Sequence, residues 1–263
     1  MREDNKEIQE PTRKEVKGIL RNMKNNKSPG QNGIAIENIK YGGEQLRQKI
    51  YELITDIWKK EKMPDEWGKA SIIPILKSGD KTNCNNYWGI FLLDVVYKIL
   101  ATAIRTKLEA MVEPWMGEYQ AGFRKGRGTT DQLFIMKEVW TTCYEYNIPA
   151  VVLFVDFKKA YDSVKRSKVI EAMKEFEIPA KLQRLVIMTL KRTTCNVKTK
   201  GGKSEDFMVK TGLRQGDPLS TLLFNMVLEK TVRSTEINRD GDMLYKSHQI
   251  VGYADDLAVI ARA

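Results

Sequence analysis

The 263-residue sequence lacks any apolar run of about 18 residues, which a membrane-spanning helix requires. It begins MREDNK, a polar start without the apolar core of a signal peptide. We therefore expect an intracellular protein, in the nucleus or cytoplasm, that is not secreted and has no membrane partner. No sequence feature fixes an oligomeric state.

Cysteine and histidine are scarce, which argues against zinc sites and disulfide frameworks. The three cysteines, Cys84, Cys143 and Cys195, lie far apart, and none has a histidine nearby. We expect free thiols. We expect the single histidine, His248, on the surface or in a strand rather than acting as a general base.

Basic residues outnumber acidic ones by 44 to 34, a formal net charge of +10. Phosphates suit such an excess because neutralising them releases counterions. Charge alone leaves two hypotheses equally open, a nucleic-acid-binding protein and a basic protein without a specific partner. The apolar content of 42% is that of a globular chain.

Hydrophobic periodicity predicts helices interleaved with short strands. Helices are expected near residues 12–25, 46–58, 94–112, 130–146, 165–176, 179–191 and 218–237. A strand is expected at 70–76, where Pro74 indicates a sheet edge. Another is expected at 150–155, whose continuous apolar run is typical of a strand buried on both faces. Hairpins at 195–211 and 249–261 favour an α+β fold with an antiparallel sheet.

Acidic residues adjoin two of these strands. Asp156 ends the run 150–155, and Asp255 and Asp256 lie between two short apolar stretches. Taken alone, the Asp pair fits a solvated hairpin turn as well as a metal site. Adjacent strands lie only about 4.8 Å apart, so if these strands pair, their carboxylates converge and repel unless a cation neutralises them.

Oxygen ligands without a nearby histidine or cysteine indicate Mg²⁺ or Mn²⁺. Two such ions, roughly 3.5–4 Å apart, can activate an attacking hydroxyl and stabilise a leaving phosphate oxygen. This chemistry serves a polymerase and a nuclease equally, so the carboxylates alone leave both open.

Three ordered motifs carry a family resemblance. FVDFKKAYD at residues 154–162, GLRQGDPLS at 212–220 and YADD at 253–256 resemble the palm motifs of reverse transcriptases. Four upstream segments are similar to the fingers of non-LTR (LINE-type) retrotransposon polymerases: 27–30, 73–77, 86–87 and 120–124. The resemblance covers residues 11–261 and accounts for more of the sequence than a nuclease does.

The resemblance implies a right-hand polymerase, with fingers in residues 1–147 and an antiparallel palm sheet packed on helices in residues 148–263. Because the chain stops soon after the third motif, we expect a C-terminally truncated palm and no thumb. The implied reaction is RNA-directed DNA synthesis: a primer 3′-hydroxyl attacks a dNTP with two Mg²⁺ or Mn²⁺ ions bound. The implied partners are an RNA template, a DNA primer and dNTP.

The resemblance also implies roles for individual residues. Asp156 and Asp255 hold the metals, Asp256 lies beside them, and the backbone carbonyl of Phe157 adds a ligand. Tyr161 acts as a steric gate against a ribose 2′-hydroxyl. The residues implied in nucleotide binding are Lys77, Lys158, Lys159, Ala160, Tyr161, Gln215 and Gly216.

Several of these residues have plainer interpretations. Tyr161 fits a core aromatic, and Lys158 and Lys159 fit an exposed turn. Asp217 and Pro218 fit the start of a helix, a role compatible with binding. The basic loop is a candidate contact to the template backbone, and a solvated loop fits nearly as well. Its cations are Arg124, Lys125 and Arg127.

Residues 86–92 depart from the family pattern. They read NYWGIFL, where related sequences typically have Asn-Tyr-Arg-x-Ile-Ser-Leu. Trp88 thus replaces the arginine that clamps the incoming triphosphate, and an aromatic ring cannot form a bidentate contact with phosphate. Phe91 replaces the serine. The alternative function is therefore a catalytically impaired remnant that only binds nucleic acid.

Overall fold

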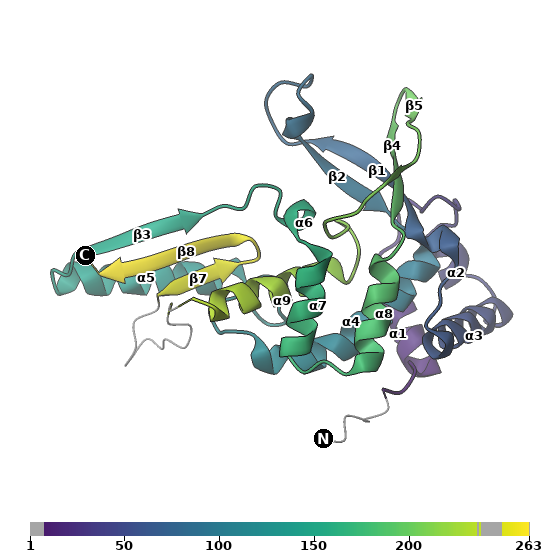
Figure 1. Ribbon diagram of the computed structural model, residues 1–263, viewed down its shortest axis with the longest axis horizontal. Coiled ribbons are helices and arrows are strands. Elements are labelled where there is room, and N and C mark those ends of the chain that lie inside the picture. The colour runs from purple at the N-terminus through teal and green to yellow at the C-terminus, as the bar shows by residue number, and fades with distance from the viewer. Residues whose placement is uncertain (1–7, 236, 238–248, 263) are drawn as a thin grey trace.

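The computed structural model describes residues 8–235, 237 and 249–262, so His248 lies outside the described residues. It contains two β-sheets, a three-stranded sheet at one end and a five-stranded sheet at the other, with helices between and beneath them (Figure 1). This arrangement confirms the predicted α+β fold with an antiparallel sheet packed on helices.

The helices expected from the periodicity are present, with bounds that differ by a few residues, whereas the short helices at 36–40 and 160–163 were not predicted. The α-helices are α1 (Arg13–Asn22), α2 (Ile36–Lys40), α3 (Glu44–Lys60), α4 (Val95–Val112), α5 (Thr129–Glu145), α6 (Ala160–Ser163), α7 (Arg166–Glu175), α8 (Ala180–Leu190) and α9 (Ser220–Arg233). Short 3₁₀ helices are η1 (Asp65–Gly68), η2 (Cys84–Asn86) and η3 (Glu113–Trp115). Helix α9 begins two residues later than expected, because Asp217 first forms a turn in which its Oδ1 accepts the N–H of Leu219 at 3.0 Å.

The three-stranded sheet contains β3 (Ala150–Val155), β8 (Asp256–Arg262) and β7 (Ile250–Tyr253) in that order, all antiparallel. In its register Val155 pairs with Leu257, and Tyr253 pairs with Asp256. The end of β3 and the β7–β8 turn therefore lie at the same end of the sheet (Figure 1).

The prediction that strand 150–155 is buried on both faces is wrong for the described structure. Val151, Leu153 and Phe154 are 58%, 61% and 70% exposed. The reason is topological: β3 is an edge strand, and β8 is its one neighbour among the described strands. An apolar run indicates that a strand favours burial, but it does not show which helix or strand packs against it.

The five-stranded sheet has the order β2-β1-β4-β5, and β6 also pairs with β4. Its strands are β1 (Lys69–Leu76), β2 (Tyr87–Leu92), β4 (Thr194–Thr199), β5 (Gly202–Lys203) and β6 (Phe207–Met208). β1 is not an edge strand as Pro74 suggested, since it lies between β2 and β4, but at Pro74 itself β2 is its one neighbour among the described strands. The parallel ladder with β4 ends at Ile72, so the missing N–H of Pro74 removes no bond from it.

The sheet with β1 and β2 crosses the expected boundary at residue 147, because β4, β5 and β6 all come from the second half of the chain. Below it, α4 packs against α1, α8 and α9, and α7 packs against α8 and α9. The fully buried residues Ile99, Leu100 and Ile104 of α4 lie in this core. No helix in the described ranges has both the length and the hydropathy to cross a bilayer.

A buried polar cluster joins this core to the segment before α9. Arg214 Nη2 lies 2.6 Å from Asp217 Oδ2, and the Tyr97 hydroxyl donates to the same oxygen at 2.5 Å. Arg214 also donates to the Thr189 carbonyl of α8 at 3.2 Å. Burial raises the pKa of Tyr97 well above its usual value, so its hydroxyl stays protonated. The cluster thus connects α4, α8 and the turn that contains Gln215.

Replacing Arg214 by Met is expected to lower the free energy of unfolding by roughly 3–5 kcal/mol, because it leaves the Asp217 carboxylate buried without its cation. Urea denaturation followed by circular dichroism measures the change. The control is Arg192→Met, which removes the arginine of an ion pair whose side chains are 85% and 78% exposed. That variant should be nearly as stable as the parent chain. Equal stability of the two variants would show that the buried Arg214–Asp217 pair does not stabilise the fold.

Candidate active site

The sheet register brings the predicted acidic residues together. Asp156 follows the last residue of β3, and continuing the ladder beyond Val155 and Leu257 places it opposite Asp256. Asp255 precedes Asp256 in the β7–β8 turn. Neighbouring strands are about 4.8 Å apart, so the three Cα positions lie at one end of one sheet.

The acidic side chains are not arranged as a closed metal cluster. Within the described ranges, no group of three acidic, histidine or cysteine side chains could hold a metal ion as placed. Asp156 and Asp256 are exposed, and Asp255 is half-buried. Carboxylates are the donors that Mg²⁺ and Mn²⁺ require, and exposed side chains can change rotamer. The site therefore fits these ions in donor type and backbone position.

Tyr161 lies between the core and these carboxylates. Its ring stacks on Phe224 of α9, with centroids 5.1 Å apart and planes at 27°. Its buried hydroxyl has no hydrogen-bond partner among the described residues. Burial raises the pKa of this phenol, and the negative charge of Asp255 raises it further. Tyr161 is thus a packed aromatic, as the plainer interpretation holds, and its protonated hydroxyl lies close enough to sense Asp255.

The second motif lies against strand β2. The Phe91 N–H donates to the Gln215 carbonyl at 2.9 Å, and the Phe91 side chain is buried. Gly216 has a φ of +107°, which favours glycine, and a Cβ there would lie 3.1 Å from the Phe91 carbonyl oxygen. Gly216 is exposed and Gln215 half-buried, so a ligand can approach this backbone closely.

Two predicted nucleotide-binding lysines lie at the β1–β2 hairpin. Lys77 Nζ is 4.8 Å from the centroid of the Trp88 ring, and Trp88 is 49% exposed. Lys159 Nζ lies 3.3 Å from Asn85 Oδ1 in η2. The first motif and the hairpin are therefore in contact. Lys158 is exposed, whereas Ala160 is buried.

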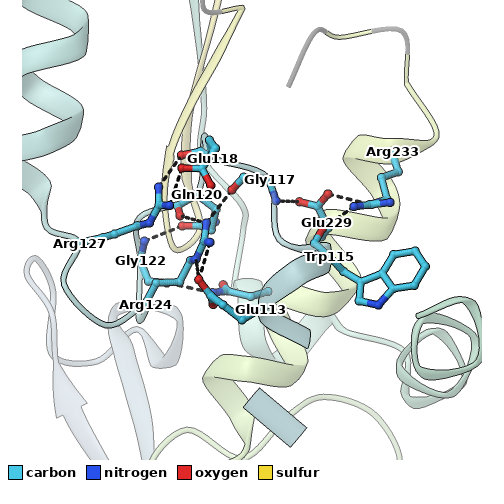
Figure 2. Close-up of polar contacts among 11 residues, drawn as sticks. Glu113, Trp115, Gly117, Glu118, Gln120, Gly122, Arg124, Arg127, Glu229 and Arg233 are labelled. Atoms are coloured by element: carbon cyan, nitrogen blue, oxygen red, sulfur yellow. Dashed lines mark hydrogen bonds and ion pairs between the residues drawn. The ribbon is translucent and has the colours of Figure 1, made fainter. Parts of the chain in front are cut away.

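The basic loop divides into a buried and an exposed part. The Arg124 side chain is 5% exposed and pairs with Glu113 at 2.6 Å (Figure 2). It also donates to the Gly117 carbonyl at 2.7 Å. Its predicted contact with nucleic acid is therefore corrected: protein acceptors already use its donors. Lys125 is exposed, and Arg127 is half-exposed and paired with Glu118. These two remain candidates.

Sequence reasoning assigned no role to Gln120 or Phe224, which both contact the site. Gln120 bonds to the backbone of Ala254, and Phe224 supports Tyr161. Gln120 belongs to a segment with family resemblance, but its partner is 134 positions away. No local pattern reports such a contact.

Comparisons with known proteins agree with this geometry. Residues 75–263 match the family described as "Reverse transcriptase (RNA-dependent DNA polymerase)". The chain is 25% identical over 251 residues to the Transposon TX1 uncharacterized 149 kDa protein of Xenopus laevis, covering 94% of this chain and 19% of that protein. It is 27% identical over 257 residues to the RNA-directed DNA polymerase from mobile element jockey of Drosophila melanogaster, covering 96% and 27%. The chain thus spans about a fifth to a quarter of these relatives.

A solved structure shares the fold. Apo telomerase from Candida tropicalis, truncated from its C-terminal domain, superposes with a TM-score of 0.52 at 14% identity. The alignment covers 82% of this chain and 49% of that chain. At this identity the likeness concerns the fold alone.

Trp88→Arg is expected to tighten the binding of a deoxynucleoside triphosphate with Mg²⁺ by about fivefold or more. Arginine adds a bidentate phosphate contact and frees Lys77 from the indole ring. Isothermal titration calorimetry measures the affinity. The matched control is Trp140→Arg on α5, where the replaced ring is also 49% exposed. Equal affinities of the two variants would show that position 88 does not face the triphosphate.

Proposed function

Because the chain belongs to the reverse transcriptase (RNA-dependent DNA polymerase) family, we propose that it acts as the RNA-directed DNA polymerase core of a non-LTR retrotransposon. The observation that carries the proposal is the register that puts Asp156 opposite Asp256 and beside Asp255. The substrates would be an RNA template, a DNA primer and dNTP, handled inside the cell in the nucleus or cytoplasm.

Asp156 and Asp255 are the residues that would hold two Mg²⁺ or Mn²⁺ ions, with Asp256 and the Phe157 carbonyl beside them. When bound, such ions activate the primer 3′-hydroxyl and stabilise negative charge on the phosphate that is attacked. The carboxylates orient the reacting groups, and the protein contributes mainly position and charge.

The surrounding residues would select and orient the nucleotide. The ring of Tyr161 stacks on Phe224. It would fill the space that a ribose 2′-hydroxyl needs. The open backbone at Gly216 allows close approach of the nucleotide. Lys77 and Lys159 supply point charges for the triphosphate at the β1–β2 hairpin. Lys125 and Arg127 are suited to the template backbone.

Primer extension on an RNA template with Mg²⁺ tests the function. Asp255→Asn keeps the size of the side chain and removes its charge, so extension should fall at least about 100-fold. Asp65→Asn is the control, since Asp65 is 78% exposed and lies in η1, near Arg192. Undiminished extension by Asp255→Asn would refute its role. Salt-dependent binding of an RNA–DNA duplex without extension by the parent chain would favour the impaired remnant instead.

Tyr161→Val is expected to increase ribonucleotide incorporation relative to deoxyribonucleotide by about tenfold or more, because a smaller side chain admits the 2′-hydroxyl. Competing rNTP and dNTP in the extension assay gives the ratio. The control is Tyr144→Val, where the replaced ring is 89% exposed on α5. Unchanged sugar selectivity in Tyr161→Val would remove the gate assignment.

A further inference from the structure

The turn that carries Asp255 is held by one distant side chain. Gln120 is 1% exposed, and its Oε1 accepts the N–H of Ala254 at 2.7 Å. Its Nε2 donates to the Ala254 carbonyl at 3.0 Å. A single amide therefore satisfies both polar backbone groups of the residue that directly precedes Asp255.

Ala254 needs such support. Its φ is +59°, a left-handed conformation that is uncommon for residues with a Cβ. It is also 5% exposed, so its backbone groups have little access to water. Backbone of this kind persists only where its surroundings determine it, and it concentrates at functional sites. The Gln120 amide pairs both buried backbone groups of Ala254 and thereby helps to hold its left-handed conformation.

The backbone on either side of Gln120 is paired with β7. The Gly252 N–H donates to the Tyr119 carbonyl, and the Ala121 N–H donates to the Gly252 carbonyl, both at 2.9 Å. Gly122 then passes so close that a Cβ there would lie 2.1 Å from the Ala254 nitrogen. The segment thus lies directly against the turn.

Two ion-paired side chains, Arg124 and Glu229, also form hydrogen bonds with the backbone of this segment (Figure 2). Arg124 donates to the Gln120 carbonyl at 3.0 Å while it pairs with Glu113. Glu229 of α9 accepts the Gly117 N–H at 3.1 Å and pairs with Arg233 at 2.8 Å. The buried Arg124 side chain therefore fixes the position of the Gln120 carbonyl.

We infer that Gln120 is a positioning residue for the metal site: by fixing Ala254 it sets the direction from which Asp255 and Asp256 leave the turn. This inference rests on the proposed function of these carboxylates. A residue that only stabilised the fold would affect unfolding without changing the affinity of the folded protein for a divalent cation, so metal affinity separates the two roles.

The first measurement needs neither metal nor nucleic acid. Gln120→Met keeps an unbranched side chain and removes both hydrogen bonds. Amide hydrogen exchange at Ala254 should become about tenfold faster or more in this variant, while exchange in α4 stays unchanged. Gln120→Asn, which is one methylene shorter, is the second variant and should show the same local effect with less change in the core. Unchanged exchange at Ala254 in both variants would overturn the inference.

The second measurement is Mn²⁺ affinity, followed by electron paramagnetic resonance at a temperature where all variants are folded. Loss of a group that orients metal ligands typically weakens binding 10- to 100-fold, and we expect a loss of about tenfold or more for Gln120→Met. The matched control is Gln132→Met: Gln132 is buried on α5, and its side-chain oxygen has no hydrogen-bond partner among the described residues. This variant should bind Mn²⁺ as the parent chain does.

A rescue variant tests the physical cause. Glycine adopts positive φ without a steric cost, so Ala254→Gly reduces the need for Gln120. Mn²⁺ affinity should therefore fall less when Gln120→Met is introduced beside Ala254→Gly than when it is introduced alone. Equal losses in both backgrounds would contradict the positioning role.

The outcomes distinguish this inference from the proposed function. If the parent chain binds Mn²⁺ and Gln120→Met binds it equally well, the inference fails and the proposed function stands. If the parent chain binds no Mn²⁺, or if Asp255→Asn binds it as tightly, the proposed function fails and the inference falls with it.

Discussion

The antiparallel pairing of β3 with β8 determines where the carboxylates of the site lie. It brings Asp156 of the first motif opposite Asp256 of the third, although the two residues lie far apart in the sequence. A one-residue slip would turn every side chain of β3 to the other face of the sheet and move Asp156 away from Asp256. Tyr161, the second motif and the β1–β2 hairpin all take their positions around this pair of strand ends.

The site combines concentrated negative charge with uncommon backbone. Positive φ values occur in all three motifs, at Lys159 in the first, at Gly212 and Gly216 in the second, and at Ala254 in the third. Such conformations are retained where neighbouring contacts determine them. Buried polar side chains supply those contacts: Arg214 and Asp217 brace the second motif, and Gln120 braces the third. These polar groups therefore serve the geometry of the site as well as the stability of the fold.

Local features of the fold could be predicted because local residues determine them. At the start of α1, for example, Thr12 and Glu15 form a capping box whose two reciprocal bonds join residues three positions apart. The adjacency of Asp156 and Asp256 followed from strand patterns together with the family resemblance. The side-chain rotamers that would let the three carboxylates share ions were not readable, since they depend on a cation as well as on the chain.

Features that depend on the partner of a segment could not be predicted. The apolar pattern of β3 gave no sign that Phe154 would be 70% exposed, because periodicity does not identify a neighbouring strand. The sequence predicts that Arg124 is a cation for nucleic acid, because it does not reveal the acceptors that bind its side chain, Glu113 and two backbone carbonyls. Gln120 went unassigned for the same reason: its partner is a backbone far along the chain.

Anomalous scattering from Mn²⁺, in a crystal of the protein with an RNA–DNA duplex and a dNTP, would locate the metal ions relative to the three carboxylates. We expect two peaks at the shared end of β3 and the β7–β8 turn, each with a carboxylate oxygen of Asp156 or Asp255 at about 2.1 Å. Peaks elsewhere, or an Asp156 that ligates neither ion, would contradict this expectation.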